Sequence, residues 1–189
     1  MTAMPVAERM TAEEFLARPY HPQHRWERLI DGELVNDSPL IAHQQTGGNI
    51  LFALATWTHA EAGRGLALMS LPFVLGHHDV YEPDVHWHRA ERAPARDEEP
   101  PYPFPDLVVE IRSPGTWVYD VGHKKARYEA AGVPELWLVD TASESVIVLR
   151  RSAPEAPEFD LAFEPAGDET LTSPLLPGFA LPLATVFGE

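Results

Sequence analysis

Two carboxylates and one lysine in this sequence have residue types and spacing suited to holding a divalent cation beside a phosphate ester. Glu110 lies inside the apolar run PDLVVEIRSPG, residues 105–115, which otherwise predicts a buried strand. Asp84 follows Pro83 at the start of the preceding predicted strand, and Lys124 lies on the next predicted helix. Carboxylate oxygens are preferred ligands of Mg²⁺, while a nearby lysine can orient water or neutralise charge developing on a phosphate. These residues therefore predict metal-assisted hydrolysis.

Each of these residues also has a purely structural interpretation. A buried, unpaired carboxylate costs several kcal/mol, so Glu110 could instead form an ion pair with Arg112 or with a lysine at the edge of the sheet. Asp84 could simply begin its strand, and Lys124 could pair on the helix surface with Asp120, four residues earlier. If Glu110 is an unpaired acid, its replacement by alanine should remove activity and leave the fold intact.

A pair of histidines supports a rival metal site. His86 and His88 are two residues apart on a predicted strand, so they share a face with each other and with Asp84. A strand His-x-His can hold Zn²⁺ or Fe²⁺, and with Glu91 the pattern is similar to a cupin metal site. A Pro-rich loop and a helix follow, where a cupin would continue with barrel strands. The structural alternative is a solvated strand face.

Composition limits the class of protein. The chain has 189 residues with 44% hydrophobic and 23% charged residues, which fits a single soluble domain spanning residues 1–189. It contains no cysteine, so disulfides and thiolate metal sites are excluded. No secretory signal and no apolar run of about 20 residues is visible, and we therefore expect no membrane span and a cytoplasmic location.

The strongly acidic charge bears on the partner. The formal net charge is −15, which should repel a nucleic acid at long range unless a local basic groove or a bridging metal offsets it. A non-catalytic binding module that keeps the fold and has lost activity is therefore a third interpretation. The basic residues available around a groove are Arg89, Arg92, Arg96, Arg112, Lys124, Lys125, Arg127, Arg150 and Arg151.

The pattern of secondary structure places the candidate residues on one sheet and its helices. Thr11 and Glu14 form a capping box that predicts a short helix, and Asp31-Gly32 predicts a two-residue hairpin turn. The remaining predicted elements are a helix over 40–62, strands over 66–75, 82–88 and 105–112, a Pro-rich loop over 89–104, a helix over 119–132, two strands over 135–151, and short strands over 159–187. This order predicts an α/β (α+β) domain with helices packed on a central sheet.

Several stretches together resemble the bacterial Uma-type family of restriction-endonuclease-like proteins, a branch of the PD-(D/E)XK nuclease superfamily. The resemblance runs from about Met10 to Leu183. It is carried by MTAEEFLARP, WERLIDGELV, SPLIAHQQTGGNI, EPDV, PDLVVEIRSPGT, DVGHKKARYEAAGVPELWLVD and LPGFALPL.

The resemblance implies a restriction-endonuclease-like mixed sheet flanked by helices and a metal-dependent endonuclease that hydrolyses DNA phosphodiester bonds. It implies that Asp84, Glu110 and the backbone carbonyl of Ile111 bind Mg²⁺ or Mn²⁺. Glu27 and His43 match an acidic and a helix-start position of the family and are expected to assist. A homodimer is also expected, because nucleases of this kind often cut duplex DNA with two copies.

Two positions depart from the superfamily pattern. The lysine usually stands two residues after the acid, where this chain has Arg112, so Lys124 on the helix is the expected catalytic lysine and Lys125 the weaker candidate. His123 stands where glutamate is commoner. The charge of Arg112 could weaken cation binding or contact a phosphate, and the sequence leaves both open.

Overall fold

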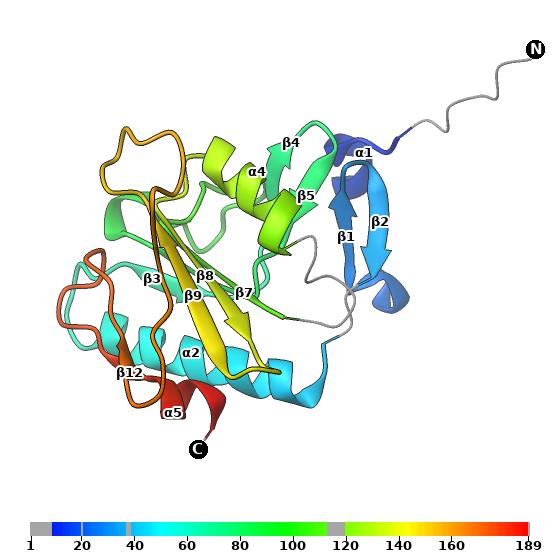
Figure 1. The fold of residues 1–189 in the computed structure, drawn as a ribbon. Coiled ribbons are helices and arrows are strands. Elements are labelled where there is room, and N and C mark those ends of the chain that lie inside the picture. The colour runs from blue at the N-terminus through cyan, green and yellow to red at the C-terminus, as the bar shows by residue number, and fades with distance from the viewer. Residues whose placement is uncertain (1–8, 20, 37–38, 113–119, 189) are drawn as a thin grey trace, which may run out of the picture.

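A six-stranded mixed sheet forms the centre of the molecule (Figure 1). The computed structural model describes residues 9–19, 21–36, 39–112 and 120–188. The strand order is β10-β9-β8-β7-β6-β3. The strands are β3 (Leu66–Leu68), β6 (Val85–His88), β7 (Leu107–Ile111), β8 (Glu135–Asp140), β9 (Ser145–Arg150) and β10 (Leu161–Phe163).

One parallel pair lies at the middle of this sheet. β7 and β8 run parallel, and the other neighbouring strands of the sheet run antiparallel. A parallel pair needs a crossover, and here the connection includes a π-helical turn (Asp120–Lys124) that leads into α4 (Lys125–Ala130). The expected mixed sheet with flanking helices is therefore confirmed. The strand stop expected at 113–115 lies outside the described residues.

The two faces of β7 are covered by different helices. Val109 and Ile111 belong to the apolar cluster that includes Ile50 and Leu54 of α2 (Ile41–His59). Val108 points to the opposite face, where it joins the cluster that contains Tyr128 of α4. Since side chains alternate along a strand, Glu110 shares the α4 face with Val108. Figure 1 shows α2 and α4 on opposite sides of the central strands, with α5 (Leu183–Phe187) beside α2.

A second sheet of four strands packs at one side, in the order β2-β1-β5-β4. Its strands are β1 (Glu27–Ile30), β2 (Glu33–Asn36), β4 (Phe73–Gly76) and β5 (Asp79–Tyr81). The predicted hairpin turn is confirmed, because Asp31 and Gly32 adopt φ values of 50° and 77° between β1 and β2. The predicted capping box is also confirmed at the start of α1 (Ala12–Leu16).

The segment over 66–75 was expected to form one strand, and that expectation is wrong. Its first part is β3 of the central sheet, and its last part begins β4 of the second sheet. Ser70 between them has a φ of 53°, and Pro72 has no N–H to offer to a sheet, so pairing stops there.

The rest of the described chain is short or irregular. Residues 89–104 include a 3-10 turn (Ala90–Arg92) and form the expected Pro-rich loop. The C-terminal part forms a two-stranded sheet, β11 (Thr170–Leu171) with β12 (Leu181–Pro182), and a further 3-10 turn (Pro22–His24) precedes β1. Within the described ranges, no helix has the length and apolar character that crossing a bilayer requires.

Gly65 is required where the chain enters β3. Its φ is +81°, and a Cβ placed there would lie 2.0 Å from the carbonyl oxygen of His88. We expect Gly65→Ala to lower the free energy of unfolding by about 3–5 kcal/mol, because strain in the left-handed region adds to a clash with backbone. Urea denaturation measures the change.

Gly63 supplies the matched control for this prediction. Its φ is +86°, but a Cβ there would meet nothing within 4 Å. Gly63→Ala should therefore cost only about 1–2 kcal/mol. Equal losses in the two variants would show that the close approach to His88 does not matter.

Candidate active site

Glu110 is buried and held by two side chains from the π-helical turn and α4, residues 120–130, which together are called the helical segment. Its side chain is 3% exposed, and its Oε2 lies 3.0 Å from Nζ of Lys124. The Tyr128 hydroxyl donates a 2.5 Å hydrogen bond to Oε1. Lys124 and Tyr128 are themselves buried. A carboxylate can remain in this strand because both of its oxygens receive donors, one of them charged.

The helical segment is aligned by a second buried carboxylate. Arg127 Nη2 lies 2.9 Å from Asp79 Oδ2, and His123 Nε2 lies 3.5 Å from Asp79 Oδ1. Residues four apart on a helix lie on one side, so His123 and Arg127 face Asp79 while the next pair, Lys124 and Tyr128, faces Glu110. His123, where the resemblance predicts a glutamate, thus contacts the second sheet.

Asp84 lies near the end of β7 that carries Glu110. It directly precedes β6, whose first residue, Val85, pairs with Val109 of β7. Asp84 Oδ2 also accepts a 2.7 Å hydrogen bond from the backbone N–H of Ile111. The structure therefore brings the two carboxylates to the same end of the same strand pair.

The carbonyl of Ile111 is directed toward the same edge. In an extended strand, the N–H and C=O of one residue point to the same neighbouring strand. The N–H of Ile111 bonds Asp84, whereas the N–H of the next residue, Arg112, bonds Val139 of β8 on the other side. The Ile111 carbonyl is thus on the Asp84 side of β7.

His43 joins the group from the opposite face of the sheet. It lies in the first turn of α2, is 7% exposed, and has Nε2 3.2 Å from Asp84 Oδ2. His43 thus pairs with Asp84 and Lys124 pairs with Glu110, and the backbone N–H of Ile111, the residue after Glu110, contacts Asp84.

The oxygen atoms present fit a hard divalent cation. Mg²⁺ is commonly bound through one or two carboxylates and keeps several waters, so Asp84, Glu110 and the Ile111 carbonyl are a sufficient set. In the ranges that the structure describes, no group of three or more His, Asp or Glu side chains is arranged to hold a metal. The donor set therefore suits a water-rich Mg²⁺ or Mn²⁺ site better than an enclosed protein cage.

Glu27 makes its described contacts elsewhere. Its carboxylate lies 2.7 Å from Arg18 Nη2 and 2.6 Å from His24 Nδ1, and it lines a cavity of about 320 Å³ that also contains Glu82. Burial acts to raise the pKa of Glu27, but hydrogen bonds from His24 and Arg18 outweigh it and lower that pKa. Assistance from Glu27 stays a prediction, because these contacts do not join it to the Glu110 cluster.

Arg112 pairs with Asp140. The Nη1 atom of Arg112 lies 2.6 Å from Asp140 Oδ2, at the end of β8. One structural alternative was an ion pair between Glu110 and Arg112. In the structure, Glu110 pairs instead with Lys124 of the helical segment. The description of Glu110 as an unpaired acid is wrong, and Glu110→Ala would leave a buried ammonium without its carboxylate.

Sequence reasoning assigned no role to Tyr128, Asp79 or Asp140. Tyr128 stands four residues after Lys124, and this spacing is the signal that could have placed it beside Glu110. Asp79 and Asp140 lie at strand ends, where carboxylates are common, so nothing local distinguishes them. Their partners come from distant parts of the chain.

His86 and His88 form a buried pair, so the expectation of a solvated face is wrong. Both are 0% exposed, and His86 Nδ1 lies 3.0 Å from His88 Nε2. The ring of Phe73 packs against His86, with the two ring centroids 5.0 Å apart. Burial lowers the pKa of His86 to about 3 and that of His88 to about 4. The mixed sheet with its parallel pair also departs from the all-strand barrel of a cupin.

Comparison with known proteins connects this arrangement to a family. The family model described as "Uma2: Putative restriction endonuclease" matches residues 12–184. No curated protein matches the chain.

A solved structure has the same fold. It is entitled a putative nuclease belonging to DUF820 from Anabaena variabilis ATCC 29413, and it is 18% identical in sequence. The match covers 95% of this chain and 98% of that chain with a TM-score of 0.74. At this identity, the likeness confirms the restriction-endonuclease-like fold.

The buried histidine pair should make stability depend on pH. In the unfolded chain these histidines take up protons near pH 6.5, whereas in the folded chain their pKa values are about 3 and 4. The free energy of unfolding is therefore highest above about pH 6.5 and falls as the pH drops toward 4. We expect a loss of roughly 2–4 kcal/mol between pH 7 and pH 5, measured by urea denaturation.

The double variant His86→Asn, His88→Asn tests the origin of this loss. It should flatten the dependence between pH 7 and pH 5, whatever its stability at pH 7. His77→Asn, at an exposed histidine, is the control and should keep the wild-type slope. An unchanged slope in the double variant would assign the acid sensitivity to other groups.

Proposed function

This chain belongs to the Uma2 family, and we propose that it is a metal-dependent endonuclease that hydrolyses phosphodiester bonds in DNA. The observation that carries the proposal is the buried Glu110–Lys124 pair, with Nζ 3.0 Å from Oε2, next to Ile111, whose backbone N–H donates to Asp84. Two acids that can hold a cation, with a lysine beside them, are suited to metal-assisted phosphate hydrolysis.

In this proposal, Asp84, Glu110 and the Ile111 carbonyl hold Mg²⁺, or Mn²⁺ in its place. The ion would polarise a phosphate oxygen and lower the pKa of a bound water. Asp84 is held toward the site by the Ile111 N–H and by His43. Tyr128 holds the other oxygen of Glu110, so the orientation of that carboxylate is set before any ligand binds.

Lys124 supplies the positive charge of the proposed site. Lys124 is 4% exposed, and its ammonium is held against Glu110 beside the proposed phosphate position. It would orient the attacking water and offset the negative charge that develops on the phosphate. Glu27 and His43 are proposed to assist, His43 through its contact with Asp84.

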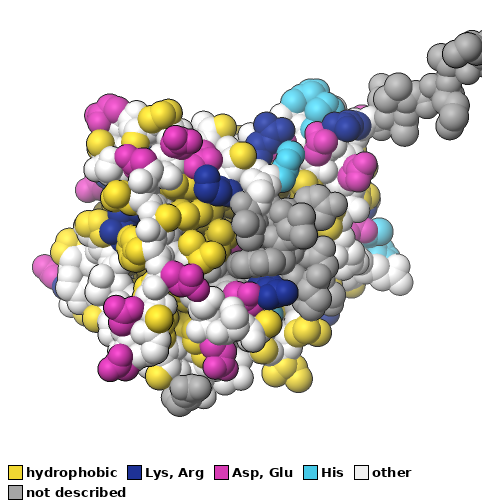
Figure 2. Space-filling model, in the orientation of Figure 1, with side chains coloured by type: hydrophobic (Ala, Val, Ile, Leu, Met, Phe, Trp, Pro, Cys, Tyr) yellow, Lys and Arg dark blue, Asp and Glu magenta, His cyan; other side chains and the backbone are white. Residues whose placement is uncertain are grey.

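DNA as the substrate must be reconciled with a net charge of −15. Figure 2 shows acidic side chains spread over the visible face, with lysine and arginine side chains scattered among them. Lys124, Lys125 and Arg127 lie in the helical segment next to Glu110, and each is paired with a carboxylate, of Glu110, Glu129 and Asp79 in turn. In this proposal the bridging cation therefore supplies the positive charge that phosphate binding needs where the overall charge opposes it.

A binding module without catalytic activity is the second candidate. The observation that favours it is that both oxygens of Glu110 already receive protein donors, from Lys124 and Tyr128. A cation would then compete with Lys124 for Glu110. Metal binding, measured without DNA, separates the two candidates.

The test uses Glu110→Gln, which keeps the shape of the side chain and a hydrogen-bond acceptor for Lys124. We expect the wild-type chain to nick supercoiled plasmid with Mg²⁺ and not with EDTA. Glu110→Gln should lower the rate by roughly 10²–10³-fold, because one anionic group at the reacting centre is lost. Titration with Mn²⁺ by calorimetry should show weakened binding in the same variant.

Glu33→Gln is the matched control, since it removes an exposed carboxylate from β2. It should nick at the wild-type rate. Wild-type activity in a folded Glu110→Gln variant would overturn the assignment of Glu110. A wild-type chain that neither binds Mn²⁺ nor nicks DNA would identify the binding module instead.

We also propose that the chain acts as a homodimer in the cytoplasm, because two copies of a single site are a direct way to cut both strands of a duplex. Sedimentation velocity at micromolar concentration should give the mass of two chains. A single species with the mass of one chain would refute the dimer.

A further inference from the structure

We infer that a cavity lined by Arg89, Arg92, Arg150 and Arg151, here called the arginine cavity, binds a phosphate-bearing anion. Its volume is about 450 Å³, within the usual range of small-ligand sites. Its other lining residues are Gly132, Pro134, Ser152, Ala153, Pro154, Pro174 and Leu175. Among the described residues none of those lining it is acidic, although the chain has 29 acidic and 14 basic residues.

The arginine cavity lies at the opposite end of the central strands from Glu110. Arg89 directly follows β6, and Arg150 ends β9 beside Glu135, the first residue of β8. Asp84 and Glu110 instead lie where β6 begins and β7 ends. The inference therefore does not depend on the proposed nuclease site.

Two arginines are anchored by a carboxylate at the start of β7. Asp106 is 0% exposed, and its Oδ1 lies 2.7 Å from Arg89 Nε and 3.1 Å from Arg92 Nη1. Its other oxygen accepts the backbone N–H of Arg89 at 3.0 Å. One buried negative charge thus holds two guanidinium groups, both of which remain more than 40% exposed.

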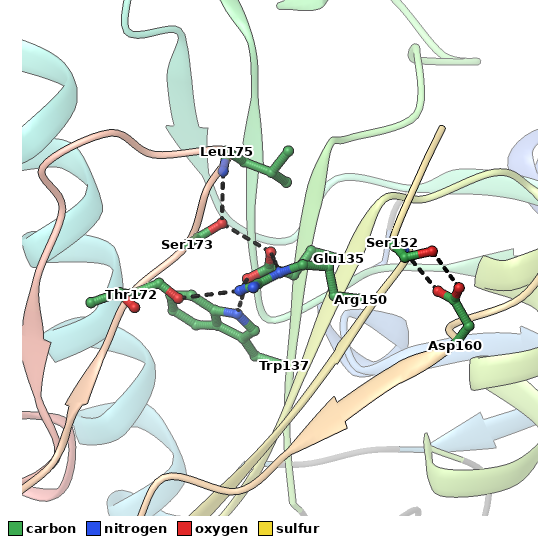
Figure 3. A network of polar contacts seen from close by, with 8 residues as sticks. All are labelled: Glu135, Trp137, Arg150, Ser152, Asp160, Thr172, Ser173 and Leu175. Atoms are coloured by element: carbon green, nitrogen blue, oxygen red, sulfur yellow. Dashed lines mark hydrogen bonds and ion pairs between the residues drawn. The ribbon is translucent and has the colours of Figure 1, made fainter. Parts of the chain in front are cut away.

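A second carboxylate anchors Arg150, as Figure 3 shows. Glu135 is 0% exposed and accepts from Arg150 Nε at 2.6 Å and from Nη2 at 3.2 Å. Trp137 Nε1 and the Ser173 hydroxyl also donate to Glu135, at 2.6 and 2.9 Å. These bonds fix the carboxylate, and the carboxylate fixes the direction of Arg150 (Figure 3).

This anchoring leaves positive charge and donors for a ligand. Four guanidinium groups share two buried carboxylates, so two positive charges are not balanced by the anchors. Within the described part of the chain, neither terminal nitrogen of Arg89 donates a hydrogen bond, and Arg150 Nη1 donates none either. Arg151 differs, because its three nitrogens bond the carbonyls of Val133, Ala156 and Glu129.

Rigid, partly exposed guanidinium forks recognise phosphate groups because they offer paired donors with little loss of conformational entropy. The arginine cavity shares Arg89, Pro174 and Leu175 with a neighbouring cavity of about 590 Å³, which Glu61 and Glu91 also line. Two sources share this chemistry: a free polyphosphate or nucleotide, and the phosphate backbone of DNA.

The experiment measures binding of inorganic pyrophosphate to the full chain by calorimetry in EDTA, which removes any contribution from a metal at Glu110. The double variant Arg89→Gln, Arg92→Gln should weaken binding tenfold or more, since charge-assisted hydrogen bonds are lost. Arg9→Gln, which removes an exposed arginine paired with Asp31 in the N-terminal part, is the matched control and should bind as wild type.

A measurement on the wild-type chain covers the case in which the double variant fails to fold. Phenylglyoxal modifies accessible arginines, and pyrophosphate should protect the peptide that contains Arg89 and Arg92 but not the one that contains Arg9. A 20-base-pair duplex that displaces pyrophosphate would identify backbone phosphate as the ligand, and failure to displace it would identify a free polyphosphate. Absence of pyrophosphate binding and protection, or equal affinity in wild type and the folded double variant, overturns the inference.

Discussion

A carboxylate inside a buried strand must be paired, and the pairing of Glu110 determines how the candidate site is built. Its oxygens receive Lys124 and Tyr128, which fixes the rotation of the helical segment above the sheet. The same rotation directs Arg127 to Asp79 on the second sheet. Two ion pairs, Glu110–Lys124 and Asp79–Arg127, therefore link the central sheet, the crossover helix and the side sheet, and the proposed chemistry uses charges that the fold already has to neutralise.

The two ends of the central strands carry opposite arrangements of charge. At one end, Asp84 and Glu110 face a single buried lysine, so negative charge is available for a cation. At the other end, buried Asp106 holds Arg89 and Arg92, buried Glu135 holds Arg150, and all three arginines line a cavity. At the arginine end a buried carboxylate orients accessible guanidinium groups, whereas Glu110 and Lys124 hold each other while both are buried.

Local pattern predicted much of the fold because each signal arises from neighbouring residues. The apolar strand around Glu110, the turn at Asp31-Gly32 and the helix over 40–62 were all predicted and are present. The segment over 66–75 was misassigned, because membership of two sheets depends on partners far along the chain. His86 and His88 were expected at the surface, since alternation predicts a shared face but not what covers it.

The sequence by itself determined the strand that carries Glu110, the helix that carries Lys124, and the membership of a nuclease-like family, because periodicity and motif spacing are properties of adjacent residues. Only the tertiary structure decided that Lys124 and Tyr128 reach Glu110, that Arg112 turns to Asp140, and that Glu27 pairs with Arg18 and His24. The physical reason is that a buried charge selects its partner from the side chains that packing brings within about 3 Å, and packing joins residues that are distant in sequence.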